Sequence, residues 1–324
     1  MTRKQSTKKK PRRDLYQEIT DRVLGILDRG VVPWRNPIRR QGGGGWPKNF
    51  TTDKRYRGIN VFLLAVTAFE RGYGSDYWLT FRQAKQKGGS IRKGEKASLV
   101  TFWKLYERTD AESGEEYKLP VLRHYNVFNA EQCEGIETPD KLLDGEEAPS
   151  VKPLPACQAI VAGYTSGPTI EHRAGSARYV PSRDQVLIPD PSAFATTEDY
   201  FAVLFHELSH STGIAKRLGR GLDEPGAAPA PFGSAEYGKE ELVAEMGAAF
   251  LAAVAGISPP TIEQSASYID NWKRQITGDT RMVVTAAAAA QKSTDWILGE
   301  TFANATHEEP TEPTASEIPT ADLS

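Results

Sequence analysis

His206 and His210 stand four residues apart in the segment YFAVLFHELSHSTG, and Glu207 directly follows the first of them. Residues four apart lie on the same face of a helix, so both imidazoles can reach one metal ion. The chain has only five histidines, and chance is a poor explanation for the pattern His-Glu-x-x-His. The spacing therefore predicts a helix that supplies two metal ligands.

A catalytic metal site needs a third protein ligand and leaves one further position to water. The other histidines offer no neat third ligand, because His124 and His172 lie upstream and His307 lies near the end of the chain. A carboxylate is the better candidate. The segment KEELVAEMGAAFLAAVAG predicts a helix on which Glu241 and Glu245 share one face.

Together the two segments resemble the zincin metallopeptidases that use two histidines and one glutamate. In those enzymes the second helix reads Glu-x-x-x-Asp, where the first acid binds the metal and the second orients a ligand histidine. The resemblance implies that Glu241 is the third ligand and Glu245 the orienting partner. Because Glu245 stands where the family has aspartate, an exchange of the two roles stays open.

The resemblance also implies metal-assisted hydrolysis, with a protein as the substrate. Zinc lowers the pKa of a bound water towards ~7, and Glu207 takes the proton as general base. A set of two histidines and one glutamate also accepts manganese or cobalt. Tyr237 or Tyr200 is a candidate for stabilising the oxyanion. Two simpler interpretations stay open, namely an ion that only joins two helices and histidines that belong to the core.

The charges of the chain are divided unevenly along its length. Residues 1–106 hold 24 Lys and Arg against 8 Asp and Glu, and the rest of the chain holds 16 against 34. This asymmetry indicates that the basic half meets a polyanion. A basic half that is merely well solvated is the alternative.

Aromatic residues are interleaved with the cations of the basic half. Binding of single-stranded nucleic acid needs cations that follow the phosphates and flat side chains on which bases stack. Four of the six tryptophans lie in this half, at positions 34, 46, 78 and 103. The pattern predicts binding of single-stranded DNA, although each tryptophan taken alone also suits a core position.

Several stretches make a resemblance specific. They are Pro33-Trp34, Tyr56-Arg57-Gly58-Ile59-Asn60, Trp78-Leu79-Thr80-Phe81-Arg82-Gln83-Ala84 and Ile91-Arg92-Lys93-Gly94-Glu95-Lys96. They resemble the N-terminal single-stranded-DNA-binding domain of the ArdC antirestriction family, which is also found in TraC-type plasmid primases. The C-terminal half resembles the metallopeptidase-like domain of the same family, through the HELSHSTG helix and Tyr268-Ile269-Asp270-Asn271-Trp272.

The resemblance implies a protein of conjugative plasmids or related mobile elements that shields incoming single-stranded DNA from host restriction. The residues expected to contact DNA are Trp34, Arg57, Asn60, Trp78, Arg82, Gln83 and Lys96. Asn60 and Gln83 suit structural roles as caps or turn formers equally well. One rival hypothesis is a pure DNA-binding module whose metal domain is a catalytically silent scaffold. Another is a free metalloprotease with nonspecific affinity for nucleic acid.

The elements that must position these residues point to an α+β chain of two domains. The first domain spans residues 14–137, with helices near 14–30, 58–71 and 80–87 and strands at 97–106 and 124–128. The second spans 156–302 and is mainly helical, with strands at 177–180 and 185–188. Its metal-site helix has Thr197 as cap, Glu198 and Asp199 in the first turn, and Gly213 at its end.

The remaining segments differ in composition from the two domains. Residues 138–155 are Pro-rich and acidic, which predicts a linker, and residues 1–13 and 303–324 predict a disordered basic arm and a disordered tail. Cys133 and Cys157 are too few for a disulfide framework, which favours a reducing cytoplasm. No run of about 18 uncharged apolar residues occurs, so we expect no membrane span. We expect no secretory signal either, because no apolar segment follows the basic residues.

Overall fold

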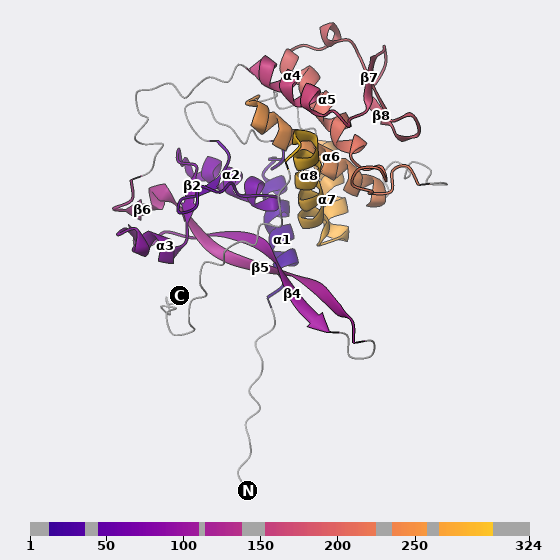
Figure 1. Ribbon diagram of the computed structural model, residues 1–324. Coiled ribbons are helices and arrows are strands. Elements are labelled where there is room, and N and C mark those ends of the chain that lie inside the picture. The colour runs from indigo at the N-terminus through magenta and orange to yellow at the C-terminus, as the bar shows by residue number, and fades with distance from the viewer. Residues whose placement is uncertain are drawn as a thin grey trace.

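The computed structural model describes residues 13–35, 45–109, 114–137, 153–224, 235–257 and 266–300. Within them the chain combines helices and β-strands, which confirms the α+β class (Figure 1). The predicted basic arm up to residue 12 and the tail from residue 301 lie outside the described residues, as does the predicted linker up to residue 152. The helices of the described segments fall short of the length and apolar character that a membrane crossing requires.

The first domain begins with two helices and a four-stranded sheet. Helix α1 (Leu15–Asp28) starts at Asp14, whose carboxylate accepts hydrogen bonds from the N–H groups of Tyr16 and Gln17. Helix α2 (Ile59–Arg71) ends at Gly72, which adopts a left-handed conformation with φ of 69°. The sheet has the order β1-β2-β5-β4, with β1 (Lys48–Asn49), β2 (Tyr77–Leu79), β4 (Ser98–Thr109) and β5 (Glu116–Asn129).

Strands β4 and β5 form a hairpin longer than the sequence predicts. They pair antiparallel from Ser98 opposite Val127 to Thr109 opposite Glu116, whereas the predicted strands ended at 106 and began at 124. The far part of the hairpin is solvent-exposed, so its residues lack the apolar alternation by which a strand is recognised. Helix α3 (Phe81–Gln86) and the small sheet of β3 (Ser90–Ile91) and β6 (Cys133–Glu134) complete the domain.

The described part of the second domain contains five α-helices and one small sheet. The helices are α4 (Pro153–Gly163), α5 (Thr197–Ser211), α6 (Ala235–Ala255), α7 (Ala266–Gly278) and α8 (Met282–Leu298). The sheet has the order β7-β9-β8, with β7 (Thr169–His172), β8 (Arg178–Val180) and β9 (Gln185–Ile188). Helix α4 begins inside the predicted linker, at Pro153, because proline suits the first turn of a helix.

An ion pair between a buried arginine and a half-buried aspartate ties this small sheet to the segment that follows α5. Both Nη atoms of Arg217 bond to the carboxylate of Asp184, at 2.7 and 2.8 Å, and the Arg217 side chain is 1% exposed. Burial raises the pKa of Asp184, but hydrogen bonds from Arg217, Lys216 and Tyr179 outweigh it and hold this pKa at about 2. The pair therefore keeps its charges at neutral pH.

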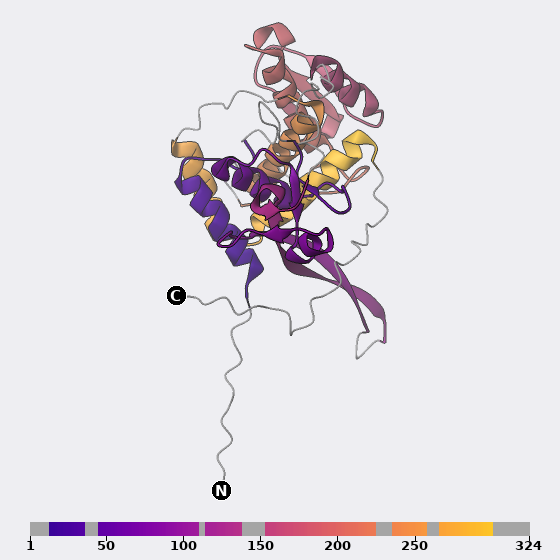
Figure 2. The same ribbon diagram turned by 90° about the vertical axis from the view of Figure 1, so that its left-hand side faces the viewer.

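The two domains share a hydrophobic core. Helix α1 lies alongside α7 in Figures 1 and 2 and also contacts α8, although it is far from both in sequence. Phe62 of α2 stacks on Phe250 of α6 at 4.8 Å between ring centroids, and Trp34 meets Trp272 edge to face at 5.6 Å. One cluster of buried residues runs from Ile19 to Ala290. The two domains therefore differ in composition, but in the folded protein they pack against each other.

Candidate metal centre and DNA-contact residues

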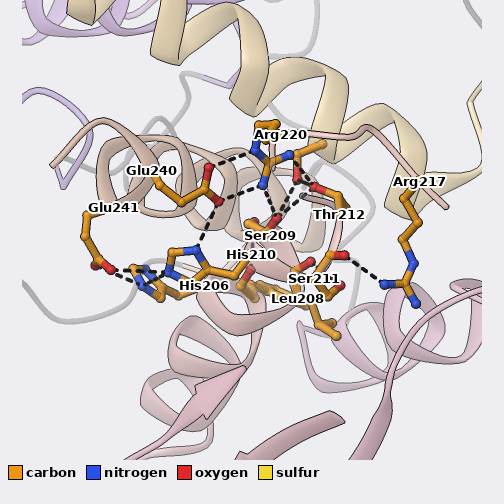
Figure 3. A network of polar contacts seen from close by, with 12 residues as sticks. His206, Leu208, Ser209, His210, Ser211, Thr212, Arg217, Arg220, Glu240 and Glu241 are labelled. Atoms are coloured by element: carbon orange, nitrogen blue, oxygen red, sulfur yellow. Dashed lines mark hydrogen bonds and ion pairs between the residues drawn. The ribbon is translucent and has the colours of Figure 1, made fainter. Parts of the chain in front are cut away.

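Helix α5 holds the two histidines in the predicted arrangement. Its N-cap is Thr196, one residue before the predicted Thr197, and a capping box with Asp199 fixes its start. His206 and His210 follow one helical turn apart, and their Nε2 atoms lie 3.1 Å from each other. Both imidazoles therefore point to one place, beside helix α6 (Figure 3).

Glu241 of α6 supplies the third donor group. Its carboxylate oxygens lie 3.5 Å from Nε2 of His206 and 3.5 Å from Nε2 of His210. One ligand atom from each of the three residues lies within 4.8 Å of the other two. Burial raises the pKa of Glu241, but its hydrogen bond with His206 and the nearby imidazoles outweigh this and keep that pKa below its usual value. Two imidazole nitrogens and an ionised carboxylate are a donor set that suits a divalent transition metal.

Glu240, which the sequence did not single out, orients one of these histidines. Its Oε1 lies 3.1 Å from Nδ1 of His210, on the side of the ring opposite the donor nitrogen. Arg220 donates two hydrogen bonds to the Glu240 carboxylate, at 2.9 and 2.8 Å, as Figure 3 shows. Burial alone would raise the pKa of Glu240, but Arg220 and His210 lower it by more. The net pKa lies below its usual value, so the carboxylate stays ionised. This contact fixes the ring and its tautomer.

The prediction that Glu245 orients a ligand histidine is wrong. Its carboxylate accepts hydrogen bonds from Arg35 at 3.1 and 2.7 Å and from the hydroxyl of Tyr268 at 2.8 Å. The helix thus turns Glu245 towards the shared core and Glu240 towards His210. Spacing on α6 could not separate three glutamates within six residues, because their roles depend on what packs against each one.

Glu207 is held close to the ligand histidines by the edge of the small sheet. Its side chain is buried, and its Oε2 accepts a hydrogen bond from the backbone N–H of Tyr179 on β8 at 2.7 Å. This contact fixes the orientation of the carboxylate. The neighbour of His206 in sequence is therefore a carboxylate with a defined position, as a proton acceptor requires.

Of the two tyrosines considered for an oxyanion, only Tyr237 lies beside the donor set. It hydrogen-bonds to Glu241, and burial together with the charge of that carboxylate raises the pKa of the phenol. Tyr200 instead places its hydroxyl 3.0 Å from Nε2 of His172. Tyr237 therefore remains a candidate, and Tyr200 is engaged elsewhere.

In the first domain, Trp34 and Trp78 lie in the core, so their predicted contact with bases is wrong. They are 2% and 1% exposed. Trp34 packs on Trp272 of α7, and Trp78 packs in a cluster with Leu64 and Val100. Large aromatic side chains gain most from burial, and the sequence pattern of mixed cations and rings does not show which rings are covered.

Asn60 and Gln83 have the structural roles that the sequence left open, and the fold, not DNA, engages their side-chain amides. The amide of Asn60 bonds to the backbone of Thr101 on β4 from both sides, at 2.6 Å to the carbonyl and 2.7 Å from the N–H. Gln83 accepts a hydrogen bond from the N–H of Thr80 at 2.8 Å and closes the capping box of α3.

Arg57 joins the two domains. It forms an ion pair with Asp295 of α8, and the next residue, Gly58, donates its N–H to Gln291 of the same helix at 3.1 Å. Gly58 has φ of 57°, a conformation that favours glycine. Of the seven predicted contact residues, only Arg82 and Lys96 are classed as exposed, and they stay predictions.

Two family models cover most of the chain. Residues 13–128 match the N-terminal domain of the anti-restriction factor ArdC, and residues 156–289 match a zincin-like metallopeptidase. The two-domain architecture expected from the sequence is thereby confirmed. The division between the matches falls where the composition changes.

Relatives match almost the whole chain. An uncharacterised protein of Sinorhizobium fredii, y4eC, is 32% identical over 292 residues, which are 88% of this chain and 91% of the relative. The DNA primase TraC of Escherichia coli is 32% identical over 309 residues, which are 90% of this chain and 27% of the primase. The chain thus spans about a quarter of that primase.

Solved structures are similar over the same range. The metal-free structure of the antirestriction ArdC protein from plasmid R388 is 36% identical, with a TM-score of 0.67, over 89% of this chain and 97% of that one. The Mn(II)-bound structure of the same protein is 34% identical, with a TM-score of 0.69, over 89% and 98%. The likeness therefore covers both domains at once.

Proposed function

The chain belongs to the family of ArdC antirestriction factors, and from this premise we propose that it binds single-stranded DNA and protects incoming DNA from host restriction. The excess of 24 basic over 8 acidic residues in positions 1–106 supports binding to a polyanion. The name of the R388 relative supports the antirestriction role. A conjugative plasmid or a related mobile element is the genetic setting that this role fits.

We also propose that the second domain holds a divalent cation between His206, His210 and Glu241. The observation that carries this proposal is the convergence of three donor atoms from α5 and α6 within 4.8 Å. Zinc suits the donor set, and manganese or cobalt suits it as well. The Mn(II)-bound structure of the R388 relative supports a divalent metal without selecting zinc. Such a cation supplies Lewis acidity, which lowers the pKa of a water molecule towards ~7.

The residues around the centre divide the work of a peptide hydrolysis. Glu207, fixed by the Tyr179 N–H, accepts a proton on its free carboxylate oxygen and later returns it to the leaving amine. Glu240 holds the His210 ring with Nε2 towards the donor set. The phenol of Tyr237 hydrogen-bonds to Glu241, and turning away from that carboxylate would let it donate to a developing oxyanion. The substrate would be a protein.

Glu207→Gln tests the hydrolytic role without removing a ligand. The variant should keep its metal, measured by elemental analysis, and lose turnover of an unfolded test protein such as casein. Glu198→Gln, on the first turn of the same helix, is the matched control and should keep both. Wild-type levels of turnover in Glu207→Gln would refute its role as base.

A binding module with a silent metal domain is the second candidate function, and the shared core favours it. Because one buried cluster joins both domains, we expect the second domain to stabilise the first whether or not it cleaves anything. Antirestriction in cells separates the two candidates. If Glu207→Gln protects transferred DNA as well as the wild type does, the peptidase chemistry is dispensable for protection.

Binding of single strands is tested with the full chain. We expect it to bind a 30-nucleotide oligothymidylate more tightly than a duplex of the same length, with affinity that falls steeply as salt rises. Fluorescence anisotropy over a salt series measures both. Equal affinity for the duplex, or affinity that is independent of salt, would count against a dedicated single-strand site.

A further inference from the structure

The β4–β5 hairpin extends past the helices as a projecting arm in both views of the molecule (Figures 1 and 2). We call residues 102–109 and 116–125 the arm. Residues directly opposite each other in an antiparallel pair share a face, and successive residues alternate between faces. The register, with Phe102 opposite Arg123 and Arg108 opposite Tyr117, therefore assigns every side chain of the arm to one of two faces.

One face of the arm turns towards α1. The ring of Trp103 lies 6.3 Å from that of Tyr16, and Nη1 of Arg13 lies 2.7 Å from Nε2 of His124. Nearer the tip this face carries charges of both signs. Its ionisable side chains there are Glu107 on β4 and Glu116 and Lys118 on β5. This face has no excess of positive charge.

The opposite face carries cations and rings and no acid. Its members are Phe102, Lys104, Tyr106 and Arg108 on β4 and Tyr117, Leu119, Val121, Arg123 and Tyr125 on β5. Phe102 and Tyr125 stack at 4.7 Å with an interplanar angle of 4°, and Nζ of Lys104 lies 5.3 Å from the centre of the Tyr106 ring. Arg108, Tyr117, Leu119 and Arg123 are exposed. We call these nine residues the basic–aromatic face.

At its base this same face continues into the core. Val100 and Val127 lie on it by register, and they are buried in a cluster with Leu64 of α2. The N-terminus of α2 lies at Thr101, where Asn60 bonds to the strand. Beyond that point the residues of the basic–aromatic face change from buried to half-buried and exposed. The face is therefore fixed to the core at one end and becomes accessible to solvent towards the tip of the hairpin.

Resting on the proposed binding of single-stranded DNA, we propose that the basic–aromatic face of the arm is a contact surface for the strand. Side chains on one face of a strand recur every ~6.8 Å, a spacing comparable with that of successive phosphates in an extended nucleotide chain. Three cations can follow the phosphates while the half-exposed rings stack on unpaired bases. The absence of any carboxylate among the nine residues gives the charge complementarity that this partner requires.

Arg108→Ser and Lys118→Ser test the face with a matched pair. Both residues are exposed cations near the tip, and they occupy adjacent register positions on opposite faces. Full-length protein is titrated onto fluorescein-labelled oligothymidylate of 30 nucleotides. Losing one phosphate contact should lower the salt slope by about 0.7 and weaken binding about fivefold at 0.1 M salt in Arg108→Ser. Lys118→Ser should stay within about twofold of the wild type.

Tyr117→Leu and Leu105→Ala test stacking in the same way. Tyr117 is 49% exposed on the basic–aromatic face, and Leu105 is 52% exposed on the other face. The tyrosine variant should bind at least about fivefold more weakly, because stacking on a ring is lost. The leucine variant should bind as the wild type does. Thermal unfolding by circular dichroism checks that all four variants fold.

The outcomes separate this inference from the function on which it rests. If the wild type binds no oligothymidylate, the proposed function fails. If the wild type binds and Arg108→Ser and Tyr117→Leu bind equally well, only the placement on this face fails. Equal losses for the two variants of each matched pair also overturn the placement. Equal loss of affinity for duplex and single strands would assign the face to duplex DNA and overturn the single-strand inference.

Discussion

The candidate metal centre and the β4–β5 arm are built in opposite ways. At the centre helices α5 and α6 meet, His210 is held by Glu240, and the neighbouring Glu207 is held by the backbone N–H of Tyr179. Towards its tip the arm is a two-stranded hairpin with exposed side chains, and its geometry there comes from the pairing of β4 with β5. A single substitution at the centre should therefore cause a large, local loss of metal binding. The arm should respond with small losses that add up over many positions.

The largest expected effect is the removal of a donor imidazole. His206→Ala should lose stoichiometric metal, because two protein ligands do not hold the ion. Elemental analysis after gel filtration measures this, and His124→Ala, outside the centre, is the control. Oligothymidylate binding should stay unchanged in both. Full metal occupancy in His206→Ala would remove the basis for the comparison.

The next effect concerns the shared core, which supports both regions. Phe250→Ala should lower the free energy of unfolding by about 4 kcal/mol, because it removes a ring stacked on Phe62 and tilted against Trp46. Circular dichroism and tryptophan fluorescence in urea should give one coincident transition. Phe81→Ala, at a side chain 53% exposed, should change the stability by less than about 0.5 kcal/mol. Two separate transitions, only one of them shifted, would show that the domains fold independently.

A somewhat smaller loss is expected at the ion pair between the buried Arg217 and the half-buried Asp184. Asp184→Asn leaves the Arg217 guanidinium without its counter-charge and should cost about 3 kcal/mol at pH 7. Because the pKa of Asp184 falls from 3.8 to about 2 on folding, the folded state binds fewer protons. The stabilisation is complete above pH ~4 and is lost as the pH falls towards ~2. Urea unfolding of the wild type and of Asp184→Asn at pH 7 and pH 3 measures this. The difference between their free energies of unfolding should be smaller at pH 3.

The orienting carboxylate should contribute less than a ligand. Glu240→Gln is expected to weaken metal affinity by about 10- to 100-fold, since the His210 ring loses its charged partner. Glu245→Gln should leave metal affinity within about threefold, because that carboxylate faces Arg35 and Tyr268. Competition with a metal-chelating dye measures both. A larger loss of metal affinity in Glu245→Gln than in Glu240→Gln would support the orienting role that the sequence predicted for Glu245.

The smallest effect is expected on the arm. Tyr117→Leu should change the free energy of unfolding by less than about 0.5 kcal/mol and leave metal occupancy unaltered. Urea unfolding and elemental analysis test this together. A loss above 2 kcal/mol would show that the arm contributes to the core, which would break the contrast between the two regions.

The sequence predicted those features that depend on local spacing. His206 and His210 share one face of α5 because helical periodicity brings residues four apart together, whatever the rest of the chain does. Glu241, on another helix, followed from the resemblance to zincins and not from spacing, and α6 brings it close to both histidines. Glu240 was overlooked and Glu245 was given the wrong role, because the role of each depends on an arginine, Arg220 or Arg35, that approaches from another element. Trp34 and Trp78 were misjudged for a related reason. Whether a ring is covered depends on tertiary packing. Trp34 is covered in part by Trp272 of the second domain, and Trp78 is covered by Leu64 and Val100 of its own domain.

The double hydrogen bond between Asn60 and Thr101 has a consequence for how the molecule behaves at high concentration. Strand β4 is the outer strand of its sheet, so its open backbone groups could pair with a strand from another copy and start aggregation. The Asn60 amide occupies both backbone groups of Thr101 as a neighbouring strand would. It closes the ladder at the root of the hairpin, so that intermolecular strand addition cannot propagate from the exposed tip into the body of the protein.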